Sequence, residues 1–174
     1  MKTKLLLLIL IILTYSQCKE IIKSDYSESE KSYITAQIQK EIDTLILAVS
    51  TKNIDLYMKK MPQDFVIYDE NGSQISREQQ REFALRDWSI IDTTLNNAMI
   101  IDSIDFVSID SIYVYTFQKW ERLMFQRDGI TVDTVLTTQK HRELWKKRDA
   151  EWIGYDVEEL GGEIFINGQK YDPN

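Results

Sequence analysis

The chain has 174 residues, of which 43% are hydrophobic and 11% aromatic, and this composition is enough to fill a single core. The formal net charge is −7, with one histidine and no basic stripe, which argues against nucleic acid and anionic lipid surfaces as partners. The single cysteine excludes an internal disulfide.

Residues 1–17 are predicted to be a secretory signal. Lys2 and Lys4 precede an unbroken aliphatic stretch from Leu5 to Leu13, which is the charged-then-apolar order of such signals. A membrane-spanning helix needs about 20 apolar residues, and this stretch is too short. We therefore expect the mature protein outside the cytoplasm. Losing Lys2 and Lys4 removes two positive charges and takes the net charge from −7 to −9.

Cys18 lies directly after this apolar segment, where it resembles the lipobox of bacterial lipoproteins. In that family the cysteine carries lipid and becomes the first residue. The resemblance implies a bacterial membrane anchor on Cys18, on the periplasmic or surface side. Residues 18–32 are largely polar and charged and show no period, which predicts a tether. Tyr15 and Gln17 differ from the common lipobox residues, so secretion without lipid is the alternative, although it leaves an exported free thiol unexplained.

Two segments have the apolar spacing of amphipathic helices. The first begins at Tyr33 and carries Ile34, Ile38, Ile42, Leu45, Ile46 and Val49 on one side. The second begins at Ser76, with Gln79 completing a capping box, and carries Phe83, Ala84, Trp88, Ile91 and Leu95. A short helix stopped by Pro62 and a strand over residues 65–68, ending at an Asn71–Gly72 turn, are expected between them.

From Met99 to Leu160 the apolar residues alternate with a spacing of two, which predicts four strands. Tight turns are expected at Asp110–Ser111, Asp128–Gly129 and Asp149–Ala150. Helices before a long meander predict an α+β fold, in which N-terminal helices pack on one face of a long, curved antiparallel sheet. The domain should span residues 33–160, and residues 161–174 should form a C-terminal hairpin turned at Asn167–Gly168.

This order of elements resembles the nuclear-transport-factor-2-like fold. That cone-shaped domain is shared by ketosteroid isomerases, scytalone dehydratase, polyketide cyclases and the association domain of calmodulin-dependent kinases. The resemblance is carried by the sequences YDENG at residues 68–72 and HRELWKKRDAEWIGYDVEEL at residues 141–160, where a basic hairpin has a tryptophan on each arm. It implies a fold more closely than a function, because this fold hosts unrelated activities.

Counting outward from two-residue turns gives a predicted register for the last three strands. Thr116 should lie opposite His141, His141 opposite Glu158, and Glu143 opposite Asp156. One face then collects Thr116, Gln118, Trp120, Gln139, His141, Glu143, Asp156 and Glu158. The other face collects Tyr113, Tyr115, Phe117, Leu136, Leu144, Ile153, Tyr155 and Val157.

A histidine between a hydroxyl and a carboxylate has the composition that general acid–base catalysis needs. The catalytic candidates are therefore His141, Glu158, Glu143 and Asp156, and the ligand-binding candidates are Thr116, Trp120, Trp88 and His141. The alternative is that the polar face meets water while the aromatic face forms the core.

Other chemistry finds little support in the sequence. No metal site is expected, because His141 has no second histidine or a nearby cysteine to support it, and no cofactor motif is present. Asp69 is expected to initiate the Asn71–Gly72 turn. One basic run is present, and such runs are typical of exposed sheet, where charged side chains prevent pairing with other chains. Its members are Lys140, Arg142, Lys146, Lys147 and Arg148.

The leading hypothesis is a non-catalytic ligand-binding or interaction domain held at the cell envelope by lipid on Cys18. One alternative is a small-molecule isomerase, hydratase or cyclase working by acid–base catalysis. Another is a subunit of an envelope complex, such as a homodimer formed through the sheet. An enclosed pocket around His141 would favour the enzyme, and an exposed face without a pocket would favour the others.

Overall fold

The computed structural model of the chain describes residues 26–172, so the predicted signal and Cys18 lie outside the described residues. Its elements are α2 (Glu28–Ser50), α3 (Ile54–Lys59), β1 (Val66–Tyr68), β2 (Gln74–Ser76), α4 (Arg77–Ser89), β3 (Ile91–Phe106), β4 (Ser111–Phe125), β5 (Val132–Arg148), β6 (Glu151–Ile166) and β7 (Gln169–Lys170). The predicted α+β class is confirmed. None of the helices within residues 26–172 is long and apolar enough to cross a membrane.

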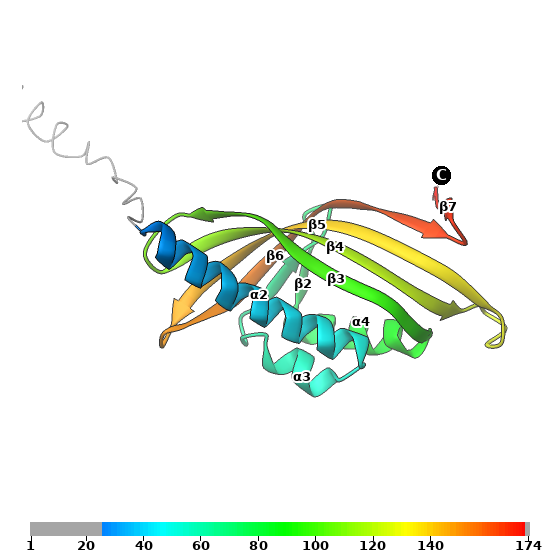
Figure 1. The fold of residues 1–174 in the computed structure, drawn as a ribbon. Helices are drawn as coiled ribbons and strands as arrows, with labels where there is room; N and C mark the ends of the chain where they lie inside the picture. The colour runs from blue at the N-terminus through cyan, green and yellow to red at the C-terminus, as the bar shows by residue number, and fades with distance from the viewer. Residues whose placement is uncertain (1–25, 173–174) are drawn as a thin grey trace, which may run out of the picture.

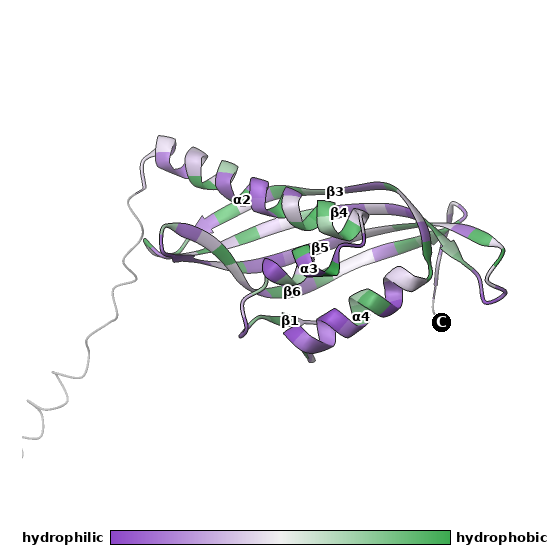
Figure 2. Ribbon diagram, turned by 90° about the horizontal axis from the view of Figure 1, so that it is seen from below, coloured by the Kyte–Doolittle hydropathy of each residue, from purple (hydrophilic) through white to green (hydrophobic). Residues whose placement is uncertain are grey.

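The three helices lie beneath a curved sheet that arches over them (Figure 1). The strand order is β2-β1-β6-β5-β4-β3, with β7 added to β6. Viewed from the helix side, α2 lies near β3 and α4 lies near β1 (Figure 2). The strands β3 to β6 form the predicted antiparallel meander, but β1 pairs in parallel with β6. The sheet is therefore mixed and not purely antiparallel.

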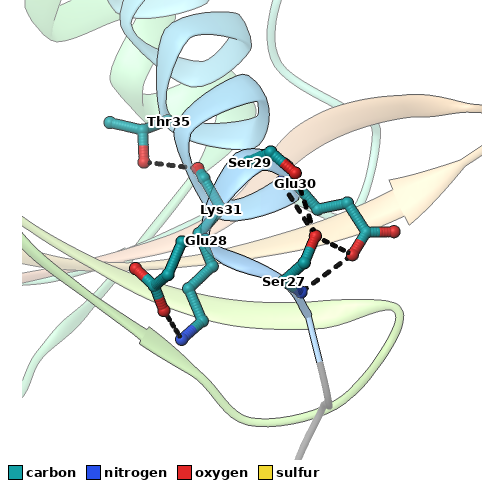
Figure 3. Close-up of polar contacts among 6 residues, drawn as sticks. All are labelled: Ser27, Glu28, Ser29, Glu30, Lys31 and Thr35. Carbon is teal, nitrogen blue, oxygen red and sulfur yellow. Dashed lines mark hydrogen bonds and ion pairs between the residues drawn. The ribbon is translucent and has the colours of Figure 1, made fainter.

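Helix α2 begins at Glu28, earlier than the predicted start at Tyr33. Ser27 Oγ accepts a hydrogen bond from the Glu30 amide at 3.4 Å, and the Glu30 carboxylate accepts one from the Ser27 amide at 2.8 Å (Figure 3). This capping box satisfies amides that have no partner inside the helix. The spacing pattern missed the first turn because residues 28–31 contain no apolar side chain. Residues 28–32, assigned above to the tether, belong to the helix.

Helix α4 has the predicted capping box between Ser76 and Gln79, but it ends at Ser89. Ile91 and Leu95, which were expected to continue its apolar side, belong to β3 instead. The segment from Ile90 to Thr94 is rich in β-branched side chains, which favour extended backbone over helix. The change from helix to strand therefore comes earlier than apolar spacing alone indicates.

The register between β4 and β5 is the predicted one, with Thr116 opposite His141. Between β5 and β6 the predicted register holds only near the turn, as far as Trp145 and Gly154. A β-bulge then shifts the pairing by one residue, so that His141 lies opposite Glu159 and not Glu158. An extra residue on one strand turns every following side chain to the other face.

Strand β6 also continues through Gly161 and Gly162, where the sequence predicted a break before a separate hairpin. A second irregularity occurs here, and Gly161 adopts a φ of +108°, which glycine tolerates and other residues rarely do. The glycines thus kink the strand without ending it. The predicted turn at Asn167–Gly168 is present, and it joins β6 to β7 within the same sheet.

The helix-covered face of the sheet is the one that carries Ile112, Val114 and Thr116, which are 0%, 0% and 2% exposed. Ile112 and Val114 form one core with the predicted stripe of α2 and with two tryptophans; its other members are Ile34, Ile38, Ile42, Trp145 and Trp152. The expectation that the aromatic face forms the core is wrong. On that face, the charged ends of Arg142 and Lys146 lie over the Tyr113 and Tyr155 rings, at 5.1 and 4.5 Å from their centroids.

Candidate functional site

A cavity of about 700 Å³ lies between the helices and the covered face of the sheet. The helices and the segment after α3 supply a wall of apolar and aromatic side chains, among them Leu45, Ile46, Val49, Tyr57, Met61, Phe65, Phe83 and Trp88. The strands supply most of the polar groups, among them Gln118, Thr137, Gln139, His141, Glu143 and Glu159. An apolar hollow with a few converging polar groups is the usual form of a small-molecule site.

The predicted tryptophans Trp88 and Trp120 both line this cavity. The Trp88 ring meets Tyr57 edge to face, with centroids 5.5 Å apart. The Tyr57 hydroxyl accepts a hydrogen bond from Gln80 Nε2 at 2.8 Å, and burial raises the pKa of Tyr57. The cavity wall therefore presents a neutral phenol among aromatic rings.

Thr116, His141 and Glu143 are in contact, as the predicted β4–β5 register implies. Thr116 Oγ1 donates to Glu143 Oε1 at 2.9 Å and lies 3.3 Å from His141 Nδ1. Trp145 Nε1 donates to Glu143 Oε2 at 2.9 Å, so both carboxyl oxygens of Glu143 have a partner. Because the Thr116 proton is directed to Glu143, we assign the ring proton to Nδ1, which leaves the lone pair on Nε2.

Burial governs the electrostatics of this cluster. It lowers the pKa of His141 from 6.5 to about 4, so the imidazole is neutral at neutral pH. Burial raises the pKa of Glu143, against the opposing effect of the hydrogen bonds from Trp145 and Thr116. The imidazole therefore keeps a free lone pair at neutral pH, although its lowered pKa makes it a weaker base than a free histidine.

Several solved structures have a fold similar to that of this chain. A hexachlorocyclohexane dehydrochlorinase, LinA type 2, matches with a TM-score of 0.65 and 13% identity, over 85% of this chain and 99% of its own. A ketosteroid isomerase-like protein from Erwinia carotovora atroseptica matches with a TM-score of 0.57 and 13% identity, over 78% and 99%. An NTF-2 like protein from Shewanella oneidensis MR-1 matches with a TM-score of 0.55 and 15% identity, over 72% and 97%.

The chain has the nuclear-transport-factor-2-like fold. This confirms the fold implied by the resemblance in the sequence. No protein-family model matches the chain, and no curated protein does either.

Three predicted site residues do not line the cavity of this nuclear-transport-factor-2-like cone, namely Thr116, Asp156 and Glu158. Asp156 and Glu158 line a smaller pocket on the uncovered side, together with Tyr113 and Arg142. Glu158 is paired with Arg142 at 2.5 Å and not with His141. The β-bulge is the reason, because it moves both carboxylates to the face opposite to the one predicted.

The bulge brings Glu159 into the cavity in their place, and the predicted register missed this residue. Glu159 is the cross-strand partner of His141, and its pKa is raised chiefly by burial and further by Glu70 and Asp69. A glycine inside a strand pattern often marks a bulge, and Gly154 was the available signal.

Asp69 has the structural role that the sequence predicted for it. Asp69 Oδ1 accepts hydrogen bonds from the amides of Asn71 and Ser73, at 2.9 and 2.8 Å, which confirms its part in the turn. Within residues 26–172 no cluster of three or more His, Cys, Asp or Glu side chains could hold a metal ion.

Proposed function

We propose that this protein binds a small, largely apolar molecule in the cavity between its helices and its sheet. The observation that carries the proposal is the cavity itself, at about 700 Å³ with mainly apolar walls. Small-molecule sites commonly have volumes of roughly 300–1,000 Å³ and a few polar groups that orient the ligand. Two structural neighbours are named for small molecules, hexachlorocyclohexane and ketosteroids, which supports a ligand of this class.

A fluorescent probe tests this proposal. N-phenyl-1-naphthylamine is neutral and becomes bright in apolar surroundings, so it should bind saturably at one site per chain. Gln139→Trp would place a bulky ring in the cavity and should abolish binding. Lys140→Trp, on the exposed side of the same strand, is the matched control and should bind as the wild type does. Equal binding by both variants would contradict the proposal.

We also propose that the binding domain is held at a bacterial membrane by lipid on Cys18. The support is the order of charged and aliphatic residues before this cysteine. In this arrangement the domain would present its cavity to the periplasm or the cell surface.

Acid–base catalysis is a second candidate function, favoured by the contact of Thr116 with His141 and Glu143, since these last two residues line the cavity. The unprotonated Nε2 assigned to His141 could abstract a proton next to a carbonyl group. Deuterium exchange from heavy water into 2-tetralone, followed by NMR, would test this step. We expect the wild type to exchange faster than His141→Gln, and equal rates would remove the catalytic candidate while leaving the binding proposal intact.

A further inference from the structure

A half-buried arginine on β4 lies against the cavity wall. Arg122 Nη1 donates to Thr137 Oγ1 at 3.0 Å and to the Trp120 carbonyl at 3.4 Å. The guanidinium carbon is 4.1 Å from the centroid of the Trp120 ring. Trp120 and Thr137 both line the cavity, and Arg122, which is not itself a lining residue, adjoins the cavity through its contacts with these two side chains.

Among residues 26–172 this cation has no ion-pair partner. None of the ion pairs within residues 26–172 includes Arg122, and its Nε has no hydrogen-bond partner there. Asp87 acts on it electrostatically, but Asp87 Oδ1 is bonded to Arg86 Nε at 2.7 Å. A partly desolvated charge without a partner costs free energy, so an anion bound here would stabilise the folded protein.

Two more hydrogen-bond donors without an acceptor lie on neighbouring positions. Among the described residues, the buried side-chain atoms that lack a partner are Asn97 Nδ2, Trp120 Nε1 and Arg122 Nε. Asn97 lies opposite Trp120, and its oxygen already accepts from Gln118 Nε2 at 3.0 Å. Each of these atoms is an N–H donor, so what is missing at this end of the sheet is a hydrogen-bond acceptor.

We propose that the cavity takes a small organic anion, with its apolar body among the aromatic side chains and its carboxylate or sulfonate bound by Arg122. This proposal rests on the proposed small-molecule binding and adds the charge of the ligand. Val135 lies opposite Arg122, and His141 is six positions further along β5, or roughly 20 Å at the usual rise of a strand. The anionic group would therefore lie far from Glu143 and Glu159.

A matched pair of probes separates charge from shape. 1-Anilinonaphthalene-8-sulfonate is N-phenyl-1-naphthylamine with an added sulfonate group. We expect the wild type to bind this anionic probe at least tenfold more tightly than the neutral one. Arg122→Met keeps much of the apolar stem and should weaken sulfonate binding about tenfold, as expected for loss of a charge-assisted hydrogen bond. The same variant should bind the neutral probe within twofold of the wild type. Arg127→Met, in the exposed β4–β5 loop, is the control and should change neither.

The outcomes distinguish the two proposals. If the wild type binds both probes equally, or if Arg122→Met weakens both alike, the anion proposal is wrong and the small-molecule proposal stands. If the wild type binds neither probe, both proposals fail. If Arg122→Met does not unfold cooperatively, the experiment uses Arg122→Lys in its place. That variant keeps the charge and should still prefer the sulfonate, whereas loss of the preference together with unchanged neutral binding would show that the guanidinium geometry is required.

Discussion

His141 is the one histidine of the chain, so its imidazole signals can be followed by NMR without assignment. Burial should hold its pKa at about 4, against 6.5 for a free imidazole. We expect its ring nitrogens to show the neutral form, protonated on Nδ1, across pH 5.5 to 8. A midpoint near 6.5 would mean that water reaches the ring, and the acid–base candidate should then be abandoned.

The same shift predicts how acid affects stability. Because the pKa of His141 is lower in the folded state, the unfolded chain takes up a proton first as the pH falls below 6.5. The free energy of unfolding should therefore decrease between pH 6.5 and 4, by roughly 3 kcal/mol from this group. His141→Gln should remove this decrease in urea unfolding curves measured at each pH. Glu143 acts in the opposite sense, since its pKa is raised, so the test is the difference between the two proteins.

At the scale of elements, one of the two irregularities of β6, the one at Gly161 and Gly162, depends on glycine. A Cβ on Gly162 would lie 2.0 Å from the Thr138 carbonyl oxygen, whereas a Cβ on Gly154 would make ordinary contact with Trp145 at 3.6 Å. Gly162→Ala should therefore cost about 1–3 kcal/mol of unfolding free energy, and Gly154→Ala much less. Thermal unfolding measures both. Equal midpoints for the two variants would show that β6 shifts freely along β5.

The first turn of α2 is a second case at this scale. Tyr26 packs edge to face on Phe106, with centroids 5.6 Å apart, and Ser27 caps the helix. A chain that begins at Ser32 should still unfold cooperatively, but with about 1–2 kcal/mol less stability, because it loses the cap and the ring contact. A chain that begins at Tyr26 is the control. If the two chains unfold at the same urea concentration, the turn contributes nothing to the domain.

At the scale of the whole molecule, the proposed lipid on Cys18 should decide where the protein is found. Expressed with its own N-terminal segment in a bacterium that processes lipoproteins, the wild type should fractionate with membranes. Cys18→Ala should move the protein to the soluble exported fraction. Mass spectrometry of the wild type supplies the second readout, and an unmodified N-terminus at any residue other than Cys18 would contradict the anchor.

Local signals in the sequence were sufficient to predict the long helices, the meander strands and one part of the site. The α2 stripe, the Ser76 capping box and the alternation from Met99 onward each depend on residues close together in the chain, and all are found in the structure. The contact of Thr116, His141 and Glu143 was predictable for the same reason, because the β4–β5 strands pair without interruption.

Only the tertiary structure decided which face of the sheet is covered and which carboxylate reaches the cavity. The alternation of the strands is compatible with helices on either face, and the choice depends on how the α2 stripe meets Ile112 and Val114. The bulge beside Gly154 then exchanges Glu158 for Glu159, since one extra residue reverses every side chain beyond it. The sequence by itself therefore determined the two long helices and the order of the four meander strands, whereas the tertiary structure determined the parallel pairing of β1 with β6, the cavity and the groups that line it.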